Sequence, residues 1–409
     1  MFSRDRWQEI FETIRKNKLR TFLSGFTVAL GIFIFIMLFG LGNGLKNTFA
    51  EFFMDDSTNV LYLYPGKTSK PYKGFKKDRR IEFDNTDLAD IKLNFPFYLE
   101  DITPRISRGA VAKYKNESDN YTTRGVAPAN QKVEKTILMQ GRFINQRDLT
   151  ERSKVVVIGR LVAEDLFKNE NPIGKFLDVG SVMFRIVGVF QDSGGDREER
   201  ILYIPYTTRQ QIEKNNDKVD QIVVTFSPKI GHAGSLAFEK KLRLFLKQKK
   251  SIDPTDSSGI FINNAADNFK RNQQFAEVLQ LIVTFVGLGT LIAGIIGISN
   301  IMVFVVKERT KELGIRKALG ATPSSVIQLI LQESIFITLI SGFIGMILGI
   351  ILLKNIGEKL EDFFIKNPYI DTTTAIWATF ILVLFGAIAG YIPAKRAASI
   401  KPIIALRDE

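Results

Sequence analysis

The stretch TFLSGFTVALGIFIFIMLFGLGNGL, residues 21–45, contains 25 consecutive uncharged residues. Because an α-helix rises 1.5 Å per residue, about 20 residues cross the roughly 30 Å hydrocarbon core of a bilayer. Three more uncharged windows, of 29, 20 and 23 residues, follow at 278–306, 334–353 and 372–394. Helices buried in a large soluble protein rarely reach such lengths without a charge. The sequence therefore predicts four transmembrane helices, and the first is too long for a signal peptide and is expected to remain as an anchor.

The segments that flank these windows set the expected orientation, because Lys and Arg concentrate in short cytoplasmic loops. Residues 1–20 carry six basic residues, 307–322 carry five and 395–409 carry four, whereas the loop 354–371 carries three basic and four acidic residues. Both termini are thus predicted to be cytoplasmic, in a multi-pass membrane protein. Apolar residues at helical spacing within 1–20 predict an amphipathic cytoplasmic helix.

The composition of the 409-residue chain excludes several classes of function. The absence of cysteine excludes disulfides, Cys-ligated metals and thiol nucleophiles, and a single histidine excludes sites with two imidazoles. No phosphate loop occurs; the nearest match, Gly66-Lys67-Thr68, has Leu61 in place of the first glycine and is interpreted as a turn. Much of the net charge of +13 is explained by the basic cytoplasmic flanks and their attraction to anionic headgroups, so no nucleic-acid partner is expected.

Residues 46–274 are predicted to form one large α+β domain outside the cytoplasm. β-branched and aromatic runs bounded by turn residues predict strands, at 60–64, 155–158, 184–190, 201–204 and 221–226. Helices are expected at 161–167, 207–214 and 236–248. The fold class is therefore a membrane protein with four transmembrane helices and a large α+β extracytoplasmic domain inserted between helices 1 and 2.

Two features of the predicted spans concern their packing. The uncharged part of the second helix, about 44 Å long at 1.5 Å per residue, exceeds the bilayer core, so this helix is expected to protrude as a stalk or to tilt. Pairs of small residues four apart favour close helix packing or dimerisation; they are 40/44, 290/294, 293/297, 345/349 and 386/390. No charge lies at the centre of a span, which argues against an ion-coupled carrier.

The connection between the second and third helices, KERTKELGIRKALGAT at residues 307–322, has the densest pattern of signals. Glu312 and Arg316 are spaced as a favourable i,i+4 ion pair. Gly320 is expected to end a short helix, and Thr322 followed by Pro323 to begin the next. Apolar contacts are expected from Leu313, Ile315, Ala318 and Leu319. A linker that merely crosses the surface does not require such a helix, so we predict that a partner binds it.

The string ERTKELGIRKALGA at 308–321 closely resembles the coupling segment of the MacB/FtsX-type ABC transporter permeases. The C-terminal IPAKRAASIKPIIALR at 392–407 is similar to the closing motif of that family. Four further strings resemble the periplasmic core domain of the family. They are QGRFINQRD, VVVIGRLVAEDLF, NPIGKFL and FRIVGVF, which begin at residues 140, 155, 171 and 184. The resemblance spans nearly the whole chain and is least clear at 65–135.

This resemblance implies a dimeric permease of the bacterial plasma (inner) membrane, without catalytic residues of its own, that is served by a cytoplasmic ABC ATPase. ATP and Mg²⁺ would bind to that ATPase, and no cofactor or metal to this chain. The ATPase-coupling residues carried over are Glu308, Arg309, Glu312, Gly314, Arg316, Lys317 and Gly320. ATP-driven motion would be relayed to the outer domain by mechanotransmission, for export or extraction of an amphipathic peptide, lipoprotein or drug. Macrolide-exporter members carry a fused ATPase domain ahead of the first helix, which this sequence does not show, so a separate ATPase subunit is expected.

The expected segments and partners complete the prediction. The segments are the N-terminal helix 1–20, helix 1 at 21–45, the outer domain 46–274, helix 2 with stalk 275–306, the coupling segment 307–322, helix 3 at 323–353, the outer loop 354–371, helix 4 at 372–394 and the tail 395–409. Expected partners are the ATPase, a second copy or a paralogous permease, the bilayer, and an extracytoplasmic adaptor or substrate protein. An FtsX-like signalling scaffold that activates a cell-wall hydrolase is the alternative function. A membrane-anchored enzyme is disfavoured, because only scattered carboxylates are available for catalysis.

Overall fold

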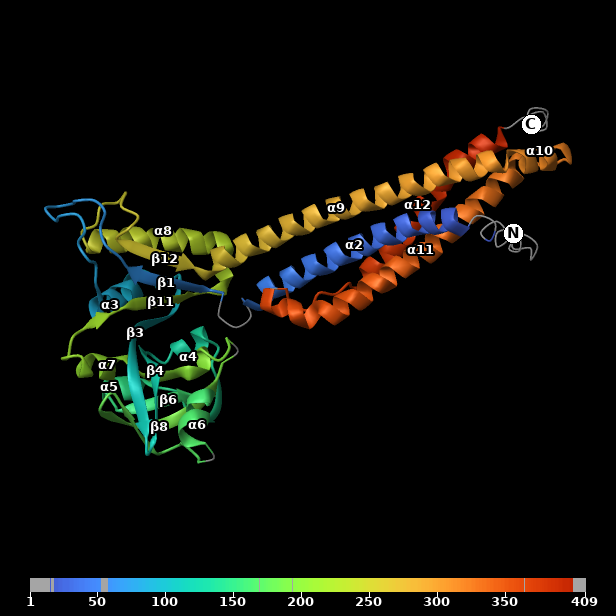
Figure 1. The fold of residues 1–409 in the computed structure, drawn as a ribbon. Helices are drawn as coiled ribbons and strands as arrows, with labels where there is room; N and C mark the ends of the chain where they lie inside the picture. Colours follow the sequence, from blue (N-terminus) through green and yellow to red (C-terminus); the bar gives the residue numbers. More distant parts are fainter. Residues whose placement is uncertain are drawn as a thin grey trace. The chain divides into compact units, whose positions relative to one another are not determined.

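The chain folds into two compact units (Figure 1). The computed structural model describes residues 15, 18–52, 58–168, 170–192, 194–363 and 365–399. The helical unit is Met1–Phe49 with Gln273–Glu409, and the α+β unit is Ala50–Asn272. The α+β domain therefore lies in the chain between the first two long apolar helices, as predicted. The predicted N-terminal helix 1–20 and the tail beyond 399 fall largely outside the described residues.

Long apolar helices make up the helical unit. They are α2 (Lys18–Phe52), α9 (Ala265–Glu308), α11 (Pro323–Leu360) and α12 (Thr372–Ala398), with short α10 (Thr310–Ala318) and η3 (Glu361–Phe363). Within the described residues, α2, α9 and α11 are long and apolar enough to cross a membrane. The fourth span stays a prediction, with α12 at its position. At 1.5 Å per residue the 44 residues of α9 extend about 66 Å, longer than the span predicted at 275–306.

Small residues let these helices approach closely within the chain. A Cβ atom placed on Gly345 of α11 would lie 2.2 Å from the carbonyl oxygen of Ala29 in α2, and one on Gly386 of α12 would lie 2.9 Å from Oγ1 of Thr338. Ser334 donates its hydroxyl to the carbonyl of Gly386 at 2.9 Å. The expectation of close helix packing is thus confirmed, since side chains of one helix fill the space that glycine leaves on the next.

The α+β unit is built on a single extended sheet. Within the described residues ten strands follow the order β12-β1-β11-β3-β4-β9-β6-β8-β5, with β7 pairing β3 and β8, and a separate β2-β10 pair. The central strands are β3 (Leu99–Tyr114), β4 (Glu117–Val126), β6 (Val155–Gly159), β8 (Val182–Gln191) and β9 (Ile201–Pro205). The outer strands are β1 (Val60–Pro65), β2 (Phe83–Asp84), β5 (Ile137–Gly141), β7 (Phe176–Val179), β10 (Lys218–Val219), β11 (Gln221–Phe226) and β12 (Ile260–Asn264).

Strand β3 joins two lobes, because its first half pairs with β11 and its second half with β4. The terminal lobe comprises residues 58–105 and 218–272, and the central lobe comprises 106–217. Their helices are α3 (Asn85–Asn94), α4 (Asn130–Val133), α5 (Gln146–Thr150), α6 (Arg160–Phe167), α7 (Tyr206–Ile212) and α8 (Gly231–Lys249), with short η1 (Glu198–Arg200) and η2 (Pro228–Ile230). Each lobe therefore combines a part of the sheet with its own helices.

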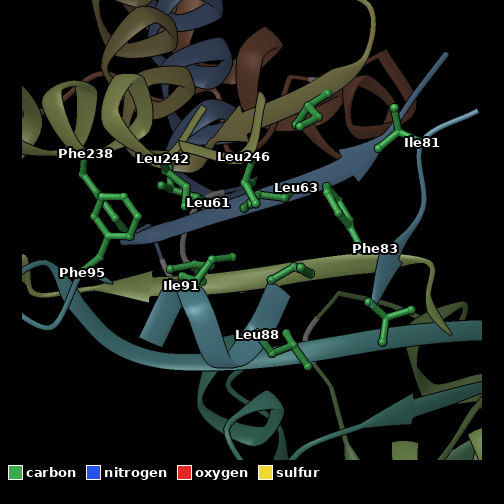
Figure 2. Packing of buried hydrophobic residues seen from close by; sticks show 14 of the residues in the cluster. Leu61, Leu63, Ile81, Phe83, Leu88, Ile91, Phe95, Phe238, Leu242 and Leu246 are labelled. Atoms are coloured by element: carbon green, nitrogen blue, oxygen red, sulfur yellow. The ribbon is translucent and has the colours of Figure 1, made fainter. Parts of the chain in front are cut away.

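The terminal lobe has its own core, which Figure 2 shows between the sheet, α3 and α8. Leu61 and Leu63 of β1 alternate toward this core and are fully buried. Phe238 of α8 stacks on Tyr98 with ring centroids 5.0 Å apart and also contacts Phe95. The central lobe buries separate apolar clusters against β4, β6, β8 and β9. Two cores within one unit explain why β3 changes partners along its length.

The structure contains every strand and helix predicted in this domain. β1, β6, β8, β9 and β11 overlap the five predicted strands, and α6, α7 and α8 overlap the three predicted helices. The long hairpin of β3 and β4 was not predicted. β4 reads ESDNYTTRGV, and several of its residues are exposed polar residues, so it lacks the apolar alternation that marks a half-buried strand.

Candidate functional site

The elbow, residues 307–322, is the segment for which the sequence predicts a partner. The hydrogen bond from the Arg309 N–H to the carbonyl of Val305 closes the end of α9, and the Leu313 N–H bonds to the carbonyl of Arg309 in turn. Arg309 has φ −89° and ψ 8°, so the chain leaves the regular helix there before α10 begins at Thr310. The connection is therefore a short, ordered helix, as predicted.

Gly320 ends this helix by a specific backbone arrangement. Its φ of +99° lies in the region that favours glycine. The N–H of Ala321 bonds to the carbonyl of Arg316 at 3.0 Å, and the N–H of Gly320 bonds to that of Lys317 at 3.1 Å. These two bonds are the Schellman pattern, which satisfies the last carbonyls of a helix. The predicted helix end at Gly320 is confirmed.

The next helix begins where the sequence indicates. α11 starts at Pro323, whose missing N–H costs nothing in the first turn. Thr322 precedes it, and its Oγ1 accepts a hydrogen bond from the N–H of Ser325 at 3.3 Å. The C-terminal end of the elbow is thus fixed by local chemistry.

The inner face of the elbow is tied to α11 by an ion pair. Arg309 Nη1 lies 3.2 Å from Oε2 of Glu333, whose side chain is 5% exposed. The Arg309 side chain, 16% exposed, also lies 3.4 Å from Glu312 through Nε. A carboxylate buried within an apolar helix is unfavourable without a partner, so Glu333 holds Arg309 in a defined position.

A second contact ties the elbow to α12. Lys317 Nζ donates to the carbonyl oxygen of Ala398 at 2.7 Å, at the last turn of α12. A cation is favourable there, because the carbonyls at a helix C-terminus carry partial negative charge. Leu313 is 3% exposed and packs into the apolar cluster of the helical unit, and Gly314 is buried beside it. The elbow is therefore held to two helices.

The outer face of the elbow combines apolar and charged residues. Leu319 is 82% exposed and Ile315 44% exposed. Glu308 and Glu312 are also exposed, and Glu312 lies 3.7 Å from Arg316. This face therefore exposes aliphatic side chains next to charged ones. The expected apolar contacts are made within the chain by Leu313, whereas Ile315, Ala318 and Leu319 are exposed.

The structure separates the predicted coupling residues into two groups. Glu308, Glu312 and Gly320 are exposed, and Arg316 is half-buried. Arg309 and Lys317 contact α11 and α12, and Gly314 is buried. Sequence reasoning missed Glu333, the partner of Arg309. A signal was present, because Glu333 is the one carboxylate near the start of the apolar third helix and such a residue calls for an ion pair.

In the α+β unit the buried charges serve to join the lobes. Arg105 of β3 is 2.5 Å from Glu134, which also lies 3.2 Å from Arg124 of β4, and Arg124 continues to Glu198 at 3.0 Å. Tyr203 of β9 is fully buried near this network, and burial raises the pKa of its hydroxyl. Among the described residues, no group of three or more His, Asp or Glu side chains is arranged to hold a metal ion.

Comparisons with known proteins agree with this architecture. Residues 21–231 match the family model of the MacB-like periplasmic core domain, and residues 284–402 match that of the FtsX-like permease C-terminal region. The macrolide export ATP-binding/permease protein MacB of Mannheimia succiniciproducens is 30% identical over 417 residues, covering 100% of this chain and 62% of that protein. MacB of Bdellovibrio bacteriovorus is 28% identical over 405 residues, covering 98% of this chain and 61% of that protein.

The periplasmic region of MacB from Actinobacillus actinomycetemcomitans aligns with 54% of this chain and 95% of that chain, at a TM-score of 0.44 and 24% identity. The two family matches define the class: an ABC transporter permease component with membrane helices and an extracytoplasmic domain. The chain belongs to the MacB/FtsX-like permease family, as the sequence motifs predicted. It spans about three fifths of the length of the MacB relatives that it matches.

Proposed function

We propose that this chain is the non-catalytic membrane subunit of an ABC transporter, and that its elbow docks onto a cytoplasmic ATPase. The observation that carries the proposal is the two-sided elbow, anchored to α11 and α12 on one face and exposing Leu319 and Ile315 on the other. Burying an exposed leucine at the end of a helix against a partner lowers the free energy, because its apolar surface is removed from water. ATP and Mg²⁺ would be bound by the ATPase.

The same geometry supports transmission of force by mechanotransmission. Motion of the ATPase would displace α10, and the Arg309–Glu333 pair and the Lys317–Ala398 bond would pass that displacement to α11 and α12. α9 is one unbroken helix from Ala265, which directly follows β12 in the chain, to Glu308 in the elbow. A continuous helix resists bending, so it is suited to relay motion toward the extracytoplasmic domain. A dimer with a second copy or a paralogous permease would provide two elbows for an ATPase dimer.

For the transported molecule we propose an amphipathic substrate, such as a peptide, lipoprotein or drug, that is exported or extracted. The support is the family membership and the relatives, which are macrolide export proteins by name. The FtsX-like alternative, activation of an extracytoplasmic hydrolase, shares the elbow and differs only in what the outer domain contacts. No contact in the described residues favours that alternative.

The test measures ATPase activity after reconstitution of the chain with its ATPase subunit in lipid nanodiscs. Leu319→Asp removes the apolar contact, and Glu312→Lys reverses the exposed charge. Burying a leucine contributes about 1.5 to 3 kcal/mol, so Leu319→Asp is expected to weaken the complex about tenfold or more. The matched control is Glu277→Lys, because Glu277 is an exposed carboxylate of α9 away from the elbow.

The expected result is loss of ATPase association and stimulation in both elbow variants and retention of both in Glu277→Lys. Unchanged association in the two elbow variants would remove the elbow as the docking site. Transport is then separated from signalling by substrate efflux from proteoliposomes, measured with the intact complex. ATP-dependent efflux supports the exporter, whereas hydrolase activation without efflux supports the scaffold.

A further inference from the structure

The loop between β1 and β2 is strongly basic. Residues 66–80, here named the basic arm, read GKTSKPYKGFKKDRR and carry seven cations and one carboxylate. The cations are Lys67, Lys70, Lys73, Lys76, Lys77, Arg79 and Arg80. This part of the chain lies in the region where the family motifs are least clear, and neither the membrane topology nor the elbow accounts for its charge.

The basic arm is an ordered hairpin. Tyr72 and Phe75 exchange backbone hydrogen bonds of 3.1 and 2.9 Å around a turn in which Lys73 has φ +46° and Gly74 φ +82°. Positive φ at both central residues is the type I′ turn, whose twist matches a β-hairpin. Nearer the base, Thr68 is buried, and its N–H donates to the carbonyl of Arg79 at 3.0 Å. The sequence predicted a turn at Gly66-Lys67-Thr68, and in the structure these residues belong to a hairpin.

Buried groups fix the base of the arm to the terminal lobe. The fully buried carboxylate of Asp256 accepts hydrogen bonds from the N–H and hydroxyl of Ser69 and from the N–H of Lys70, at 2.7, 2.9 and 3.2 Å. Arg79 donates to the carbonyls of Lys250 and Ser251 and stacks on Phe75, with its guanidinium carbon 4.2 Å from the ring centroid. The arm is therefore held in one shape before any partner binds.

Most cations of this arm lack a compensating carboxylate. Within the described part of the chain, exposed Lys67, Lys73, Lys76, Lys77 and Arg80 form no ion pair. Other lysines of the same unit are paired, such as Lys115 with Glu170 at 2.6 Å and Lys218 with Glu82 at 2.7 Å. Holding like charges close together raises the free energy of the folded arm, and a negatively charged ligand would offset that repulsion.

Two exposed aromatic rings adjoin the base of the arm. Tyr64 of β1 and Phe261 of β12 are directly opposite in the antiparallel register, so their side chains project from the same face. They are 41% and 54% exposed. A Cβ atom on Gly66 would lie 2.8 Å from Cε2 of Phe261, so this ring packs against the arm. Aromatic side chains are enriched in surfaces that bind protein chains.

The strand register fixes the position of the arm within the α+β unit. The chain enters β1 at Val60 and leaves β12 at Asn264, and Leu61 pairs with Asn264. Pro65 pairs with Ile260 at the other end of the two strands, where the arm begins. Six residues of strand extend about 20 Å. The arm thus lies at the end of this strand pair opposite to the end at which the chain enters β1 and leaves β12.

We propose that the basic arm and the Tyr64–Phe261 pair form a docking surface for an acidic segment of an extracytoplasmic protein. Aspartate or glutamate side chains of that segment bind the arm lysines, and apolar side chains of the same segment cover the two rings. Lysine suits carboxylates on a mobile segment, because its ammonium is a point charge that needs no fixed geometry. The proposal goes beyond ATPase coupling and does not depend on the elbow.

The test uses the full chain in nanodiscs of neutral phosphatidylcholine and fluorescence anisotropy. The probe is a labelled twelve-residue peptide, about ten Glu and two Phe, compared with an all-Glu peptide of the same length and with inorganic polyphosphate. The arm variant is Lys73→Glu, Lys76→Glu and Lys77→Glu together. Its matched control changes Lys92, Lys154 and Lys229 to Glu, which gives the same net charge at exposed positions away from the arm. The ring variant is Tyr64→Ala with Phe261→Ala.

We expect the arm variant to weaken binding of the Phe-containing peptide about tenfold or more and the control to change it less than about threefold. The ring variant is expected to weaken that peptide and to leave the all-Glu peptide unchanged. Melting curves confirm that each variant is folded. The proposal would be overturned if the arm variant and the control lost peptide affinity equally. It would also be overturned if polyphosphate bound as well as the peptide with no dependence on the rings, or if the chain bound anionic vesicles in place of the peptide.

Discussion

Removing the carboxylate of Glu333 is the most direct test of how the elbow is held. The Glu333→Gln change keeps the shape of the side chain and leaves Arg309 without its buried counter-ion. Breaking a fully buried ion pair costs about 3 to 5 kcal/mol. Arg309 is 16% exposed and has Glu312 as a second carboxylate at 3.4 Å, so we expect a smaller cost than this, about 2 to 3 kcal/mol.

The assay is the unfolding of the purified chain in mixed micelles titrated with SDS, followed by ellipticity. The matched control is Glu312→Gln, which removes the exposed carboxylate that also contacts Arg309 and is expected to cost under about 1 kcal/mol. A double-mutant cycle compares Arg309→Met, Glu333→Met and the double replacement of both residues by Met. The double replacement is expected to recover much of the loss, since an apolar pair leaves no buried charge without a partner.

The same variant has a functional consequence under the proposed mechanism. Glu333→Gln leaves the exposed face of the elbow intact, so the ATPase should still bind, whereas its ATP hydrolysis should couple less well to the permease. Equal destabilisation by Glu333→Gln and Glu312→Gln, or strictly additive effects in the cycle, would refute the view that this pair anchors the elbow.

Two further predictions concern other parts of the molecule. In the same SDS titration, Gly345→Ala in α11 should destabilise the helical unit by about 1 to 3 kcal/mol, since the new Cβ would meet the backbone of Ala29. The control is Gly289→Ala, which should be neutral or stabilising, because a Cβ there would meet no atom of another segment within 4 Å. Burial alone would raise the pKa of Asp84, but hydrogen bonds from Thr86 and Lys250 lower it to about 2 from 3.8. The stabilising effect of the Asp84 carboxylate is therefore complete above about pH 5 and is lost as the pH falls toward 2. The difference in melting temperature between the wild type and Asp84→Asn should shrink over that range. A constant difference would contradict the lowered pKa of Asp84.

Several features of the fold could be predicted because their signals are local. The strands β1, β6, β8, β9 and β11 are apolar runs between turn residues, and a strand of that kind is recognisable without its neighbours. The β3–β4 hairpin was not recognised, because β3 crosses from one core to another and β4 faces water along much of its length. Its position in the sheet depends on pairing with β11 and β9, which no local pattern encodes.

The candidate site divides in the same way. The C-terminal end of α10 and the start of α11 follow from Gly320, Thr322 and Pro323, whose backbone preferences act over three or four residues. The face that each elbow residue presents was not predictable, since Arg309 meets Glu333 24 residues later and Lys317 meets the carbonyl of Ala398 81 residues later. These contacts require α11 and α12 to pack first, so two of the predicted coupling residues became anchors.

The sequence by itself determined the long apolar helices, the insertion of an extracytoplasmic domain and the helical elbow, because the cost of placing charge in hydrocarbon and the backbone preferences of Gly, Pro and Thr act locally along the chain. The tertiary structure alone decided which glycine meets which helix, which side of the elbow is exposed, and that Asp256 holds the basic arm from 187 residues away. Those outcomes depend on distances between remote residues, which are set only when the cores have packed.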